Sequence, residues 1–410
     1  MCMAMAAVSC RPAGLCDNDA NAPVGWAPCL NMEGERYDLT GGFRNPSKGV
    51  EGKAVTLHAD GDSDMRLVIT KALEENDIVI LDGSQGPFIY SRTYEHTDLR
   101  HKTVVGINGA VLRTRFQFDS CSRALVRNAE EYYSDKARPD ENGVWHLPNG
   151  ETTKTNYAAF AQRMALIEHT GDNSESFTHS GFWAFLDGCE DIIIRNITFD
   201  GPGTFRSYAD FMVRCAAGAH NIWIDHCRFE DAARVAVGVT RQADFVSVTW
   251  TSFAFTDQSD GHSLANLISS SDEAFEDRGH LNVTFAHCMW DNVWSRVPMA
   301  RFGKIHILNC LYRNPGTVGI NPRTESQFLV EGCYFEPGVK PFCRYRLDVA
   351  PGDAWVFRNN VYDEGADVEN KGESVAIPYV YEMTAPQEAR EDVSSYAGPT
   401  LIEPLRVGRR

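Results

Sequence analysis

Three basic residues, Arg296, Arg301 and Lys304, lie close together in the segment from Trp294 to His306. Pro298 stands between the two arginines and breaks regular structure, so we place Arg296 on a loop. Arg301 and Lys304 stand at the start of the strand-like sequence IHILNC. The three side chains could converge on one solvent-facing groove, where they would bind an anion such as a carboxylate. The plainer alternative is that they are solvated loop residues.

The overall charge makes this basic segment stand out. The chain has 410 residues, and its 39 Lys plus Arg against 56 Asp plus Glu give a formal net charge of −17. This charge argues against nucleic acid or an anionic membrane as a partner. No apolar run reaches the roughly 18 residues that a membrane span needs. An anionic substrate would therefore need a local basic cleft.

A repeat runs through the chain from about residue 190. Short β-branched strands end in an aromatic residue at Phe199, Phe229, Phe253, Trp290, Tyr312, Phe335 and Tyr362. Intervals of 22 to 37 residues between these aromatics fit one coil of a solenoid with loops of varying length. In a parallel β-helix, equivalent residues of successive coils lie about 4.8 Å apart, so like residues stack on like.

Two columns of this repeat carry polar or sulfur side chains. The column two residues before the aromatic contains Cys227, Cys288, Cys310 and Cys333, and the column before it is rich in Asn and His. We interpret the cysteines as a ladder of interior thiols in preference to disulfides or a metal site, because the chain contains no C-x-x-C. We expect the Asn column to hydrogen-bond along the stack.

The repeat predicts an all-β fold, a right-handed single-stranded parallel β-helix that spans residues 23–410. Segments 77–83 and 102–112 predict earlier coils. Residues from about 113 to 180 predict a partly helical insertion, in which Thr155 caps a helix that Gly171 ends. Residues 363–410 predict a C-terminal cap with a helix from about 385 to 396, because a solenoid must protect its open end.

Residues 1–22 form a separate N-terminal segment. It is either the remnant of an export signal or an uninformative start. Ala7 to Cys10 loosely resemble a bacterial lipoprotein cleavage site, but no Lys or Arg precedes them. On the first interpretation we expect a secreted or cell-envelope protein, and a possible lipoprotein.

Two motifs on successive parts of the repeat resemble a known family. Arg296 to His306 read R-x-P-x-x-R-x-G followed by a His-containing strand, and Trp223 to His226 read WIDH on an earlier coil. This pair resembles the pectate and pectin lyases, polysaccharide lyase family 1. The stretches VGWA at 24–27, LTGG at 39–42 and LISSSD at 267–272 agree, and the resemblance covers most of the chain.

The resemblance implies a β-helix lyase that cleaves α-1,4-linked galacturonan, as pectin or pectate, by β-elimination. It gives Arg296 the role of the base that accepts the C5 proton and Arg301 that of a ligand for the substrate carboxylate. A C5–H beside a carboxylate is hard to remove unless cations already face that carboxylate. Arginine normally stays protonated, so an arginine base needs positive neighbours or burial to lower its pKa.

The sequence departs from the family at its calcium site. The resemblance implies two carboxylate ligands four residues apart, but these positions hold Arg234 and Gly238, and neither can bind calcium. Asp210 matches another metal ligand, although Tyr208 stands where its partner would be. We therefore predict that no cofactor is required and that Arg234 replaces the charge of calcium and binds substrate. The alternatives are that Arg234 only pairs with Asp210 or Asp231, or that calcium still binds.

Other functions stay open. His262 could bind substrate in place of a basic residue that the family carries near Asp260. A noncatalytic β-helix that binds acidic glycans is a second possibility. A galacturonan hydrolase is a weaker third one, because hydrolysis needs a pair of carboxylates. With any of these functions we expect a monomer that contacts pectic polysaccharide.

Overall fold

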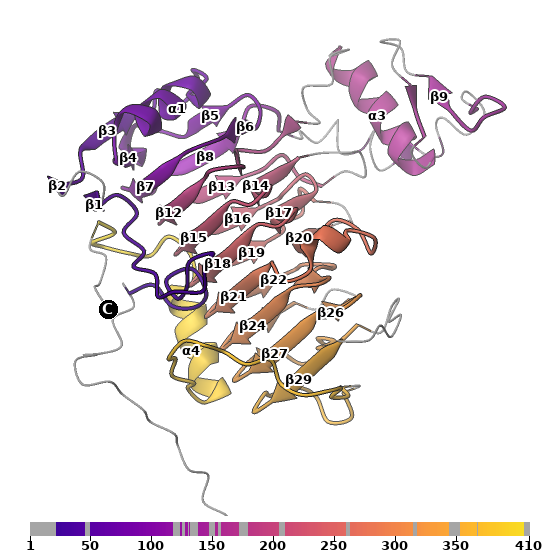
Figure 1. Cartoon of the computed structure of the whole chain (residues 1–410). Helices are drawn as coiled ribbons and strands as arrows, with labels where there is room; N and C mark the ends of the chain where they lie inside the picture. The colour runs from indigo at the N-terminus through magenta and orange to yellow at the C-terminus, as the bar shows by residue number, and fades with distance from the viewer. Residues whose placement is uncertain are drawn as a thin grey trace, which may run out of the picture.

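The computed structural model describes residues 22–45, 50–117, 124, 128–129, 131, 138–146, 152–154, 157–171, 179–204, 210–259, 263–314, 318–343, 353–366 and 368–405. Apart from Ala22, the expected N-terminal segment lies outside the described residues. The described chain winds into a solenoid of parallel strands (Figure 1). None of its helices is both long and apolar enough to cross a bilayer.

Successive coils add strands to three parallel sheets, as predicted for a right-handed parallel β-helix, although the first and last coils do not contribute to all three. The ten-stranded sheet contains β3 (Ala54–His58), β4 (Ile78–Asp82), β7 (Arg100–Ile107), β12 (Glu190–Arg195), β15 (His220–Asp225), β18 (Asp244–Thr249), β21 (Asn282–Ala286), β24 (Lys304–Leu308), β27 (Gln327–Glu331) and β29 (Ala354–Arg358). The eight-stranded sheet contains β5 (Phe88–Tyr90), β8 (Val111–Thr114), β13 (Thr198–Asp200), β16 (Arg228–Glu230), β19 (Ser252–Ala254), β22 (Met289–Asp291), β25 (Leu311–Arg313) and β28 (Tyr334–Phe335). The seven-stranded sheet contains β6 (Tyr94–His96), β11 (Trp183–Phe185), β14 (Phe211–Cys215), β17 (Val235–Val239), β20 (Leu264–Ile268), β23 (Met299–Ala300) and β26 (Asn321–Pro322).

The Asn and His column makes the bend between the ten-stranded and eight-stranded sheets. Asn196, His226 and Asn309 have φ of 58°, 47° and 48°, in the left-handed region that Asn tolerates better than most residues. Each strand that the sequence predicted as one unit is therefore two strands with a left-handed residue between them. Asn309 donates to the carbonyl of Gly332, its equivalent on the next coil, at 2.9 Å, which confirms the expected hydrogen bonding along the column.

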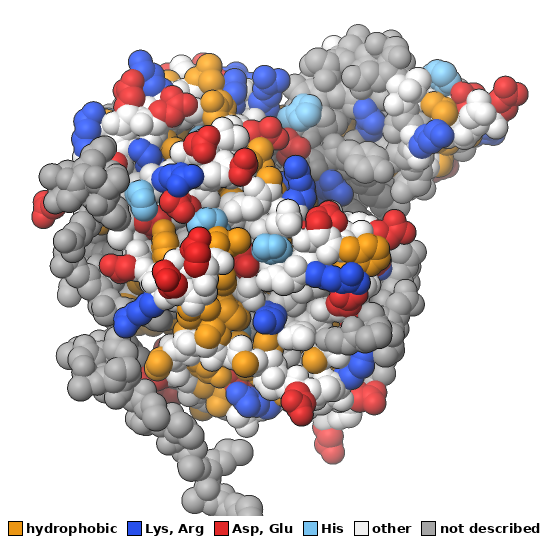
Figure 2. Space-filling view, viewed as in Figure 1, with side chains coloured by type: hydrophobic (Ala, Val, Ile, Leu, Met, Phe, Trp, Pro, Cys, Tyr) orange, Lys and Arg blue, Asp and Glu red, His pale blue; other side chains and the backbone are white. Residues whose placement is uncertain are grey.

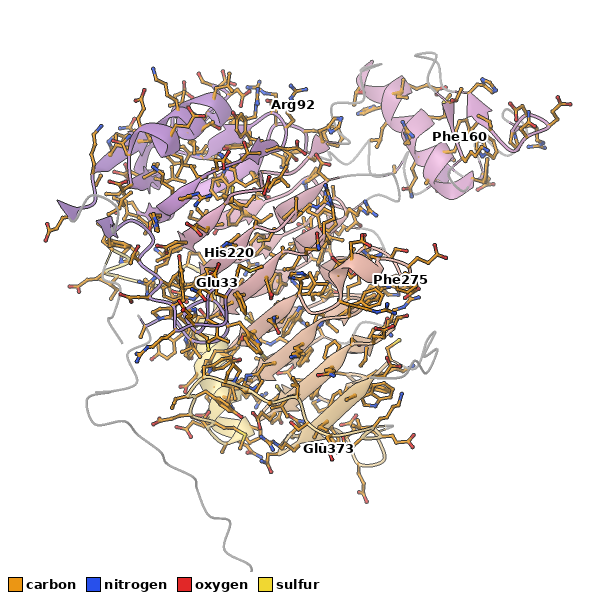
Figure 3. All side chains as sticks on the ribbon, in the orientation of Figure 1. Glu33, Arg92, Phe160, His220, Phe275 and Glu373 are labelled. Atoms are coloured by element: carbon orange, nitrogen blue, oxygen red, sulfur yellow. The ribbon has the colours of Figure 1, made fainter. Side chains whose placement is uncertain are left out.

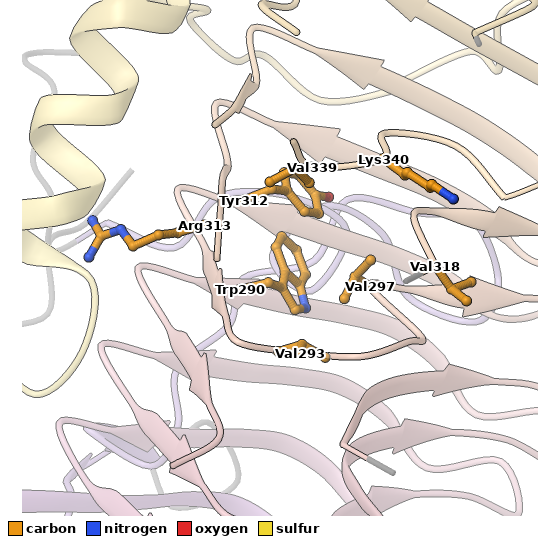
Figure 4. A pocket seen from close by; sticks show the side chains of 8 residues that line it. All are labelled: Trp290, Val293, Val297, Tyr312, Arg313, Val318, Val339 and Lys340. Atoms are coloured by element: carbon orange, nitrogen blue, oxygen red, sulfur yellow. The ribbon is translucent and has the colours of Figure 1, made fainter. Parts of the chain in front are cut away.

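The interior is a stack of like side chains. The rings of Trp290 and Tyr312 stack at 4.7 Å, and the backbone N–H of Cys288 donates to the Sγ of Cys310 at 3.3 Å. Both cysteines are free and buried, which confirms their interpretation as packing residues. A void of about 20 Å³ borders the ladder beside Trp290 and Val297 (Figure 4). It has room for about one water, so it is too small for a sugar.

The first described residues, with the VGWA stretch at 24–27, lie against the outer face of the ten-stranded sheet. The backbone N–H of Trp26 donates to Thr284 and that of Ala27 to Ser247, at 3.2 and 2.9 Å. A Cβ on Gly25, which has a φ of 101°, would lie 2.5 Å from the Oγ of Ser247, so only glycine fits at this contact. The VGWA stretch is therefore anchored to the ten-stranded sheet. A two-stranded ribbon follows it, made of β1 (Arg44–Asn45) and β2 (Val50–Glu51).

The C-terminal segment protects the last coil, but not through its helix. The predicted helix is confirmed as α4 (Pro386–Tyr396), and it lies beside β25 and β28 on the flank of the solenoid (Figure 1). The exposed edge of β29 is paired instead by Lys371, which exchanges two backbone hydrogen bonds of 2.9 Å with Trp355. At the other end, α1 (Arg66–Glu75) precedes β4 and buries Ile69 and Leu73 in the core.

The insertion contains the predicted helix. It is α3 (Tyr157–Thr170), followed by Gly171 at a φ of 67°, and a short hairpin of β9 (Trp145–His146) and β10 (Thr152–Thr153) lies with it. Trp145 stacks on Phe160, which Figure 3 labels, at 4.3 Å. Their apolar cluster includes Ala233, the residue before Arg234. The insertion thus reaches the solenoid beside the seven-stranded sheet.

The third sheet was not predicted. The sequence predicts loops for the segments of β14, β17 and β20, because only the strands that lead to the repeated aromatic show a clear pattern. Their inward residues, such as Val213 and Val237, nevertheless belong to the main core. The terminal segments lie against the other two sheets, which leaves the outer face of the seven-stranded sheet to form a groove.

Candidate functional site

Arg296 projects from a bulge that leads into β23. Leu264 pairs with Ser295, and Leu267 pairs with Met299. The first coil advances three residues between these two pairs and the second coil advances four, so the second coil contains one extra residue. Without the bulge Arg296 would lie beside Ala265, which faces the core. The extra residue and a φ of 60° at Arg296 turn its side chain to the outer face.

The environment of Arg296 lowers the pKa of its guanidinium to about 10. The largest cause is burial, and the positive charges of Arg234, Arg301 and Arg323 add to it. Its Nη1 atom is buried and has no hydrogen-bond partner among the described residues. Burial and nearby positive charge are the conditions under which an arginine loses a proton most easily. Because the charges of Arg234 and Arg301 act on Arg296, the structure brings these three predicted site residues together.

Arg301 and Arg323 share one carboxylate. The Nε of Arg301 donates to the Oδ1 of Asp272 at 2.6 Å, and the Nη2 of Arg323 donates to its Oδ2. Burial raises the pKa of Asp272, but the hydrogen bond and charge of Arg301 and the charge of Arg323 outweigh it and lower that pKa. Asp272 therefore stays ionised and fixes both guanidinium groups, which together keep an excess positive charge beside Arg296.

The calcium positions do not hold a ligand set for calcium. Asp210 and Arg234 precede paired strands and line one cavity, which places a cation next to the carboxylate. A Cβ on Gly238 would lie 2.5 Å from the ring of Phe211, so the ring occupies the space that a longer side chain would need there. Asp210 already accepts a hydrogen bond from Thr93 at 2.7 Å. Arginine and glycine supply no oxygen ligand, so the described residues do not fit this ion.

Lys304, a predicted substrate ligand, does not lie with the other basic residues. Lys304 begins β24 in the ten-stranded sheet and is exposed, and its charge is not among those that lower the pKa of Arg296. This corrects the expectation that three basic residues converge: Phe302, at a φ of 58°, and Gly303 carry the chain into another sheet before Lys304. His262 and Tyr208 lie outside the described residues.

The WIDH motif has a structural role. Asp225 is fully buried and forms an ion pair with Arg195 at 2.8 Å, and Trp223 donates to Thr249 at 2.7 Å. Both residues belong to β15, which lies in the ten-stranded sheet and not in the sheet that carries Arg296. His226 follows at the bend, and its Nδ1 donates a 2.9 Å hydrogen bond to the Asp225 carboxylate.

Several residues of this face were not predicted from the sequence. Arg323 follows Arg301 by 22 positions, the same step that separates Trp290 from Tyr312, so the column arithmetic could have found it. Arg214 and Phe211 lie on β14, and Arg214 lies over the Phe211 ring at 5.4 Å. No motif identified these two residues, because their strand was assigned to a loop. Figure 2 shows Lys and Arg side chains gathered over the ends of β14 and β17.

Known proteins resemble this chain in sequence. A family model described as pectate lyase matches residues 166–400. A probable pectate lyase A of Aspergillus flavus is 31% identical over 236 residues, which cover 54% of this chain and 66% of the relative. Pectate lyase A of Aspergillus niger is 31% identical over 231 residues, with the same coverage. The chain thus spans just under two thirds of the length of these relatives.

Solved structures share the fold. A pectate lyase of Bacillus sp. N165, solved in complex with trigalacturonate, aligns with a TM-score of 0.55 at 16% identity and covers 92% of this chain and 98% of its own. Pectate lyase II of Xanthomonas campestris aligns with a TM-score of 0.55 at 15% identity and the same coverage. The family match extends over more than half of the chain and contains the bulge with Arg296, the Arg301–Asp272–Arg323 cluster and the WIDH strand. The chain belongs to the pectate lyase family.

Proposed function

We propose that this protein cleaves galacturonan, as pectate or pectin, by β-elimination, with Arg296 as the acceptor of the C5 proton. The observation that carries the proposal is the buried, unpartnered Nη1 of Arg296 together with its pKa, lowered to about 10 by burial and three arginines. A neutral guanidine takes the proton from C5, and the C5–H electrons form the C4=C5 double bond. The C4–O bond to the leaving sugar breaks with its electron pair on the oxygen, which takes a proton from water. Family membership and the fold support this reaction class.

The remaining arginines supply the charge that the reaction needs. Removing the C5 proton builds negative charge on the uronate carboxylate, and cations fixed in advance stabilise it without reorganisation. Arg301 is held by Asp272 and by the carbonyl of Ser269 at 3.3 Å, which leaves its Nη2 for a carboxylate. Arg234 provides positive charge at the place where the family resemblance implied calcium. The proposal therefore contains no required metal.

Hydrolysis and simple binding predict other outcomes. Hydrolysis needs a protonated carboxyl group as general acid, and Asp272 does not suit that role, because its pKa is lowered and both of its oxygens are bound. A binder needs no proton acceptor, so the lowered pKa of Arg296 favours the lyase. The monomeric state stays a prediction. An extracellular location also stays a prediction, and it suits an enzyme that acts on a polysaccharide too large to enter a cell.

The product identifies the function. Polygalacturonate and methyl-esterified pectin are each incubated with the protein, and ultraviolet absorbance and reducing ends are followed together. Elimination produces a 4,5-unsaturated uronate that absorbs, hydrolysis produces reducing ends without that absorbance, and a binder produces neither. We expect both signals to rise in equal molar amounts, and reducing ends alone would refute the proposed reaction.

A further inference from the structure

A second basic site lies beyond Arg296 toward the N-terminal end of the groove. An open cavity of about 580 Å³ is formed over β6, β11 and β14, together with the start of α1 and the loop before β17. Four arginines line it: Arg66, Arg92, Arg214 and Arg234. Figure 3 labels Arg92 close to α1 and β6, at the end of the solenoid.

The lining of this cavity has an excess of positive charge. Its four guanidinium groups face two carboxylates, those of Glu95 and Asp210, in a chain whose formal net charge is −17. One of these carboxylates, Asp210, also accepts hydrogen bonds from Thr93 and His179. Burial and the charges of Arg241 and Arg234 lower the pKa of Arg214, although Asp210 and Glu95 act in the opposite direction. Like charges gathered in this way favour an anionic ligand.

Three of the four arginines pack on aromatic rings before any ligand arrives. Arg214 and Arg234 lie over the ring of Phe211 at 5.4 and 5.7 Å, and the Nε of Arg214 donates to Thr240 at 3.2 Å. Arg66 lies over the ring of Tyr94 at 5.7 Å, and its Nε is buried without a hydrogen-bond partner among the described residues. Such preorganisation reduces the entropy lost when a carboxylate binds.

The cavity and the proposed reaction centre share one face. In the seven-stranded sheet, five strand steps separate β6 from β23, which at about 4.8 Å per step is roughly 24 Å along the solenoid. Arg234 belongs to both regions, because it lines the cavity and acts on the pKa of Arg296. A polymer with repeated negative charges is long enough to contact both regions at once.

We propose that this cavity binds carboxylates of an acidic polysaccharide several sugar residues away from the bond that is broken. The inference rests on the proposed function for the identity of the polymer, and it assigns Arg66, Arg92 and Arg214 to recognition of free uronate. It predicts that the protein prefers long substrates and that free carboxylates far from the cleaved bond add to that preference.

The test compares substrates of two lengths. The ratio of kcat/KM for hexagalacturonate over trigalacturonate is measured for the wild type, Arg92→Gln and Arg214→Gln. We expect the ratio to fall about tenfold in both variants and to recover in Arg92→Lys, which keeps the charge. Lys71→Gln is the matched control, because Lys71 lies on α1, pairs with Glu75 and is 72% exposed outside the cavity. A ratio that stays at the wild-type value in both glutamine variants overturns the inference.

Two further experiments distinguish a failure of this inference from a failure of the proposed function, and uronate binding from the binding of other anions. If no substrate is cleaved, the proposed function fails, and calorimetric binding of hexagalacturonate to Arg296→Ala, with and without Arg92→Gln, decides the inference alone. Weaker binding in the double variant supports it, and equal binding overturns it. Fully methyl-esterified hexamer should show no dependence on Arg92. If inorganic phosphate binds in an Arg92-dependent way and hexagalacturonate does not, the cavity is a small-anion site and the inference is overturned.

Discussion

Arg234 stands two coils before Arg296 on the outer face of the seven-stranded sheet, and its positive charge helps to lower the pKa of the Arg296 guanidinium. Neither residue is an obvious catalyst alone. Burial disfavours the charged form of Arg296, and the charges of Arg234, Arg301 and Arg323 disfavour it further. The solenoid thereby gathers four arginines, and the repulsion between their charges favours loss of a proton from Arg296.

The pH dependence of turnover should show this lowered pKa. Arg296 must be neutral to accept a proton, so below its pKa of about 10 the active fraction rises roughly tenfold for each pH unit. We expect log kcat/KM to rise with a slope near one from pH 7 and to level off as the pH approaches 10. A profile with its maximum near neutral pH would indicate a carboxylate or histidine base instead.

Arg234→Gln should move that profile to higher pH. Removing a neighbouring positive charge raises the pKa of Arg296, so less of it is neutral at pH 8. We expect kcat/KM at pH 8 to fall about three- to tenfold, because one pKa unit corresponds to a factor of ten. Arg234→Lys keeps the charge and is the control. If the glutamine and lysine variants have the same rising limb as the wild type, Arg234 does not act on Arg296.

Asp272→Asn should destabilise the protein and impair catalysis together. The substitution leaves Arg301 and Arg323, whose side chains are 7% and 8% exposed, without their shared counter-ion. Because Asp272 is itself 38% exposed, solvent reduces the expected loss of unfolding free energy to about 2 kcal/mol. Urea unfolding measures it. Arg278→Gln, which breaks the more exposed pair with Glu325, should leave the midpoint almost unchanged, and equal effects of the two variants would argue against the cluster.

His96 should make the protein sensitive to acid. Burial lowers the pKa of His96 from 6.5 to about 4. Between these two pH values the imidazole is protonated in the unfolded chain and neutral in the folded chain. The contribution of His96 to the free energy of unfolding is therefore fully present above pH 6.5. It falls by about 3 kcal/mol as the pH is lowered toward 4. His96→Phe removes the titration and keeps a ring against Phe185, with which His96 stacks at 5.5 Å. Unfolding at pH 7 and pH 4.5 should show a smaller loss in the variant, and an identical loss would contradict this assignment.

The architecture could be predicted because the repeat places residues with strong conformational demands in columns. The aromatic and cysteine positions stack inside, and positions such as Asn309 adopt the left-handed bend between sheets. The seven-stranded sheet could not be predicted in the same way. Its strands vary in their distance from the aromatic, since loops of different length precede them, and its outer residues, such as Phe211 and Arg214, follow no repeated pattern.

The candidate site was predictable only where a local motif or the coil period determines the position. Arg296 and Arg301 belong to one motif, and Arg323 follows by one coil. Lys304 was misplaced because the turn at Phe302 sends it to another sheet, and a linear motif does not show that change. The cavity residues Arg66 and Arg92 come from segments more than a hundred residues away from Arg214, so only the folded coils bring them together.

The central claim is that Arg296 drives elimination without calcium, and the initial rate of ultraviolet absorbance on polygalacturonate tests it most directly. The wild type and Arg296→Ala are each assayed with added calcium and with a chelator. We predict that the wild-type rate in chelator stays within about twofold of the rate in calcium, and that Arg296→Ala loses a factor of about 10² to 10⁴, the usual contribution of a general base. Wild-type activity that disappears in chelator and returns with calcium, or an active Arg296→Ala, would contradict the account.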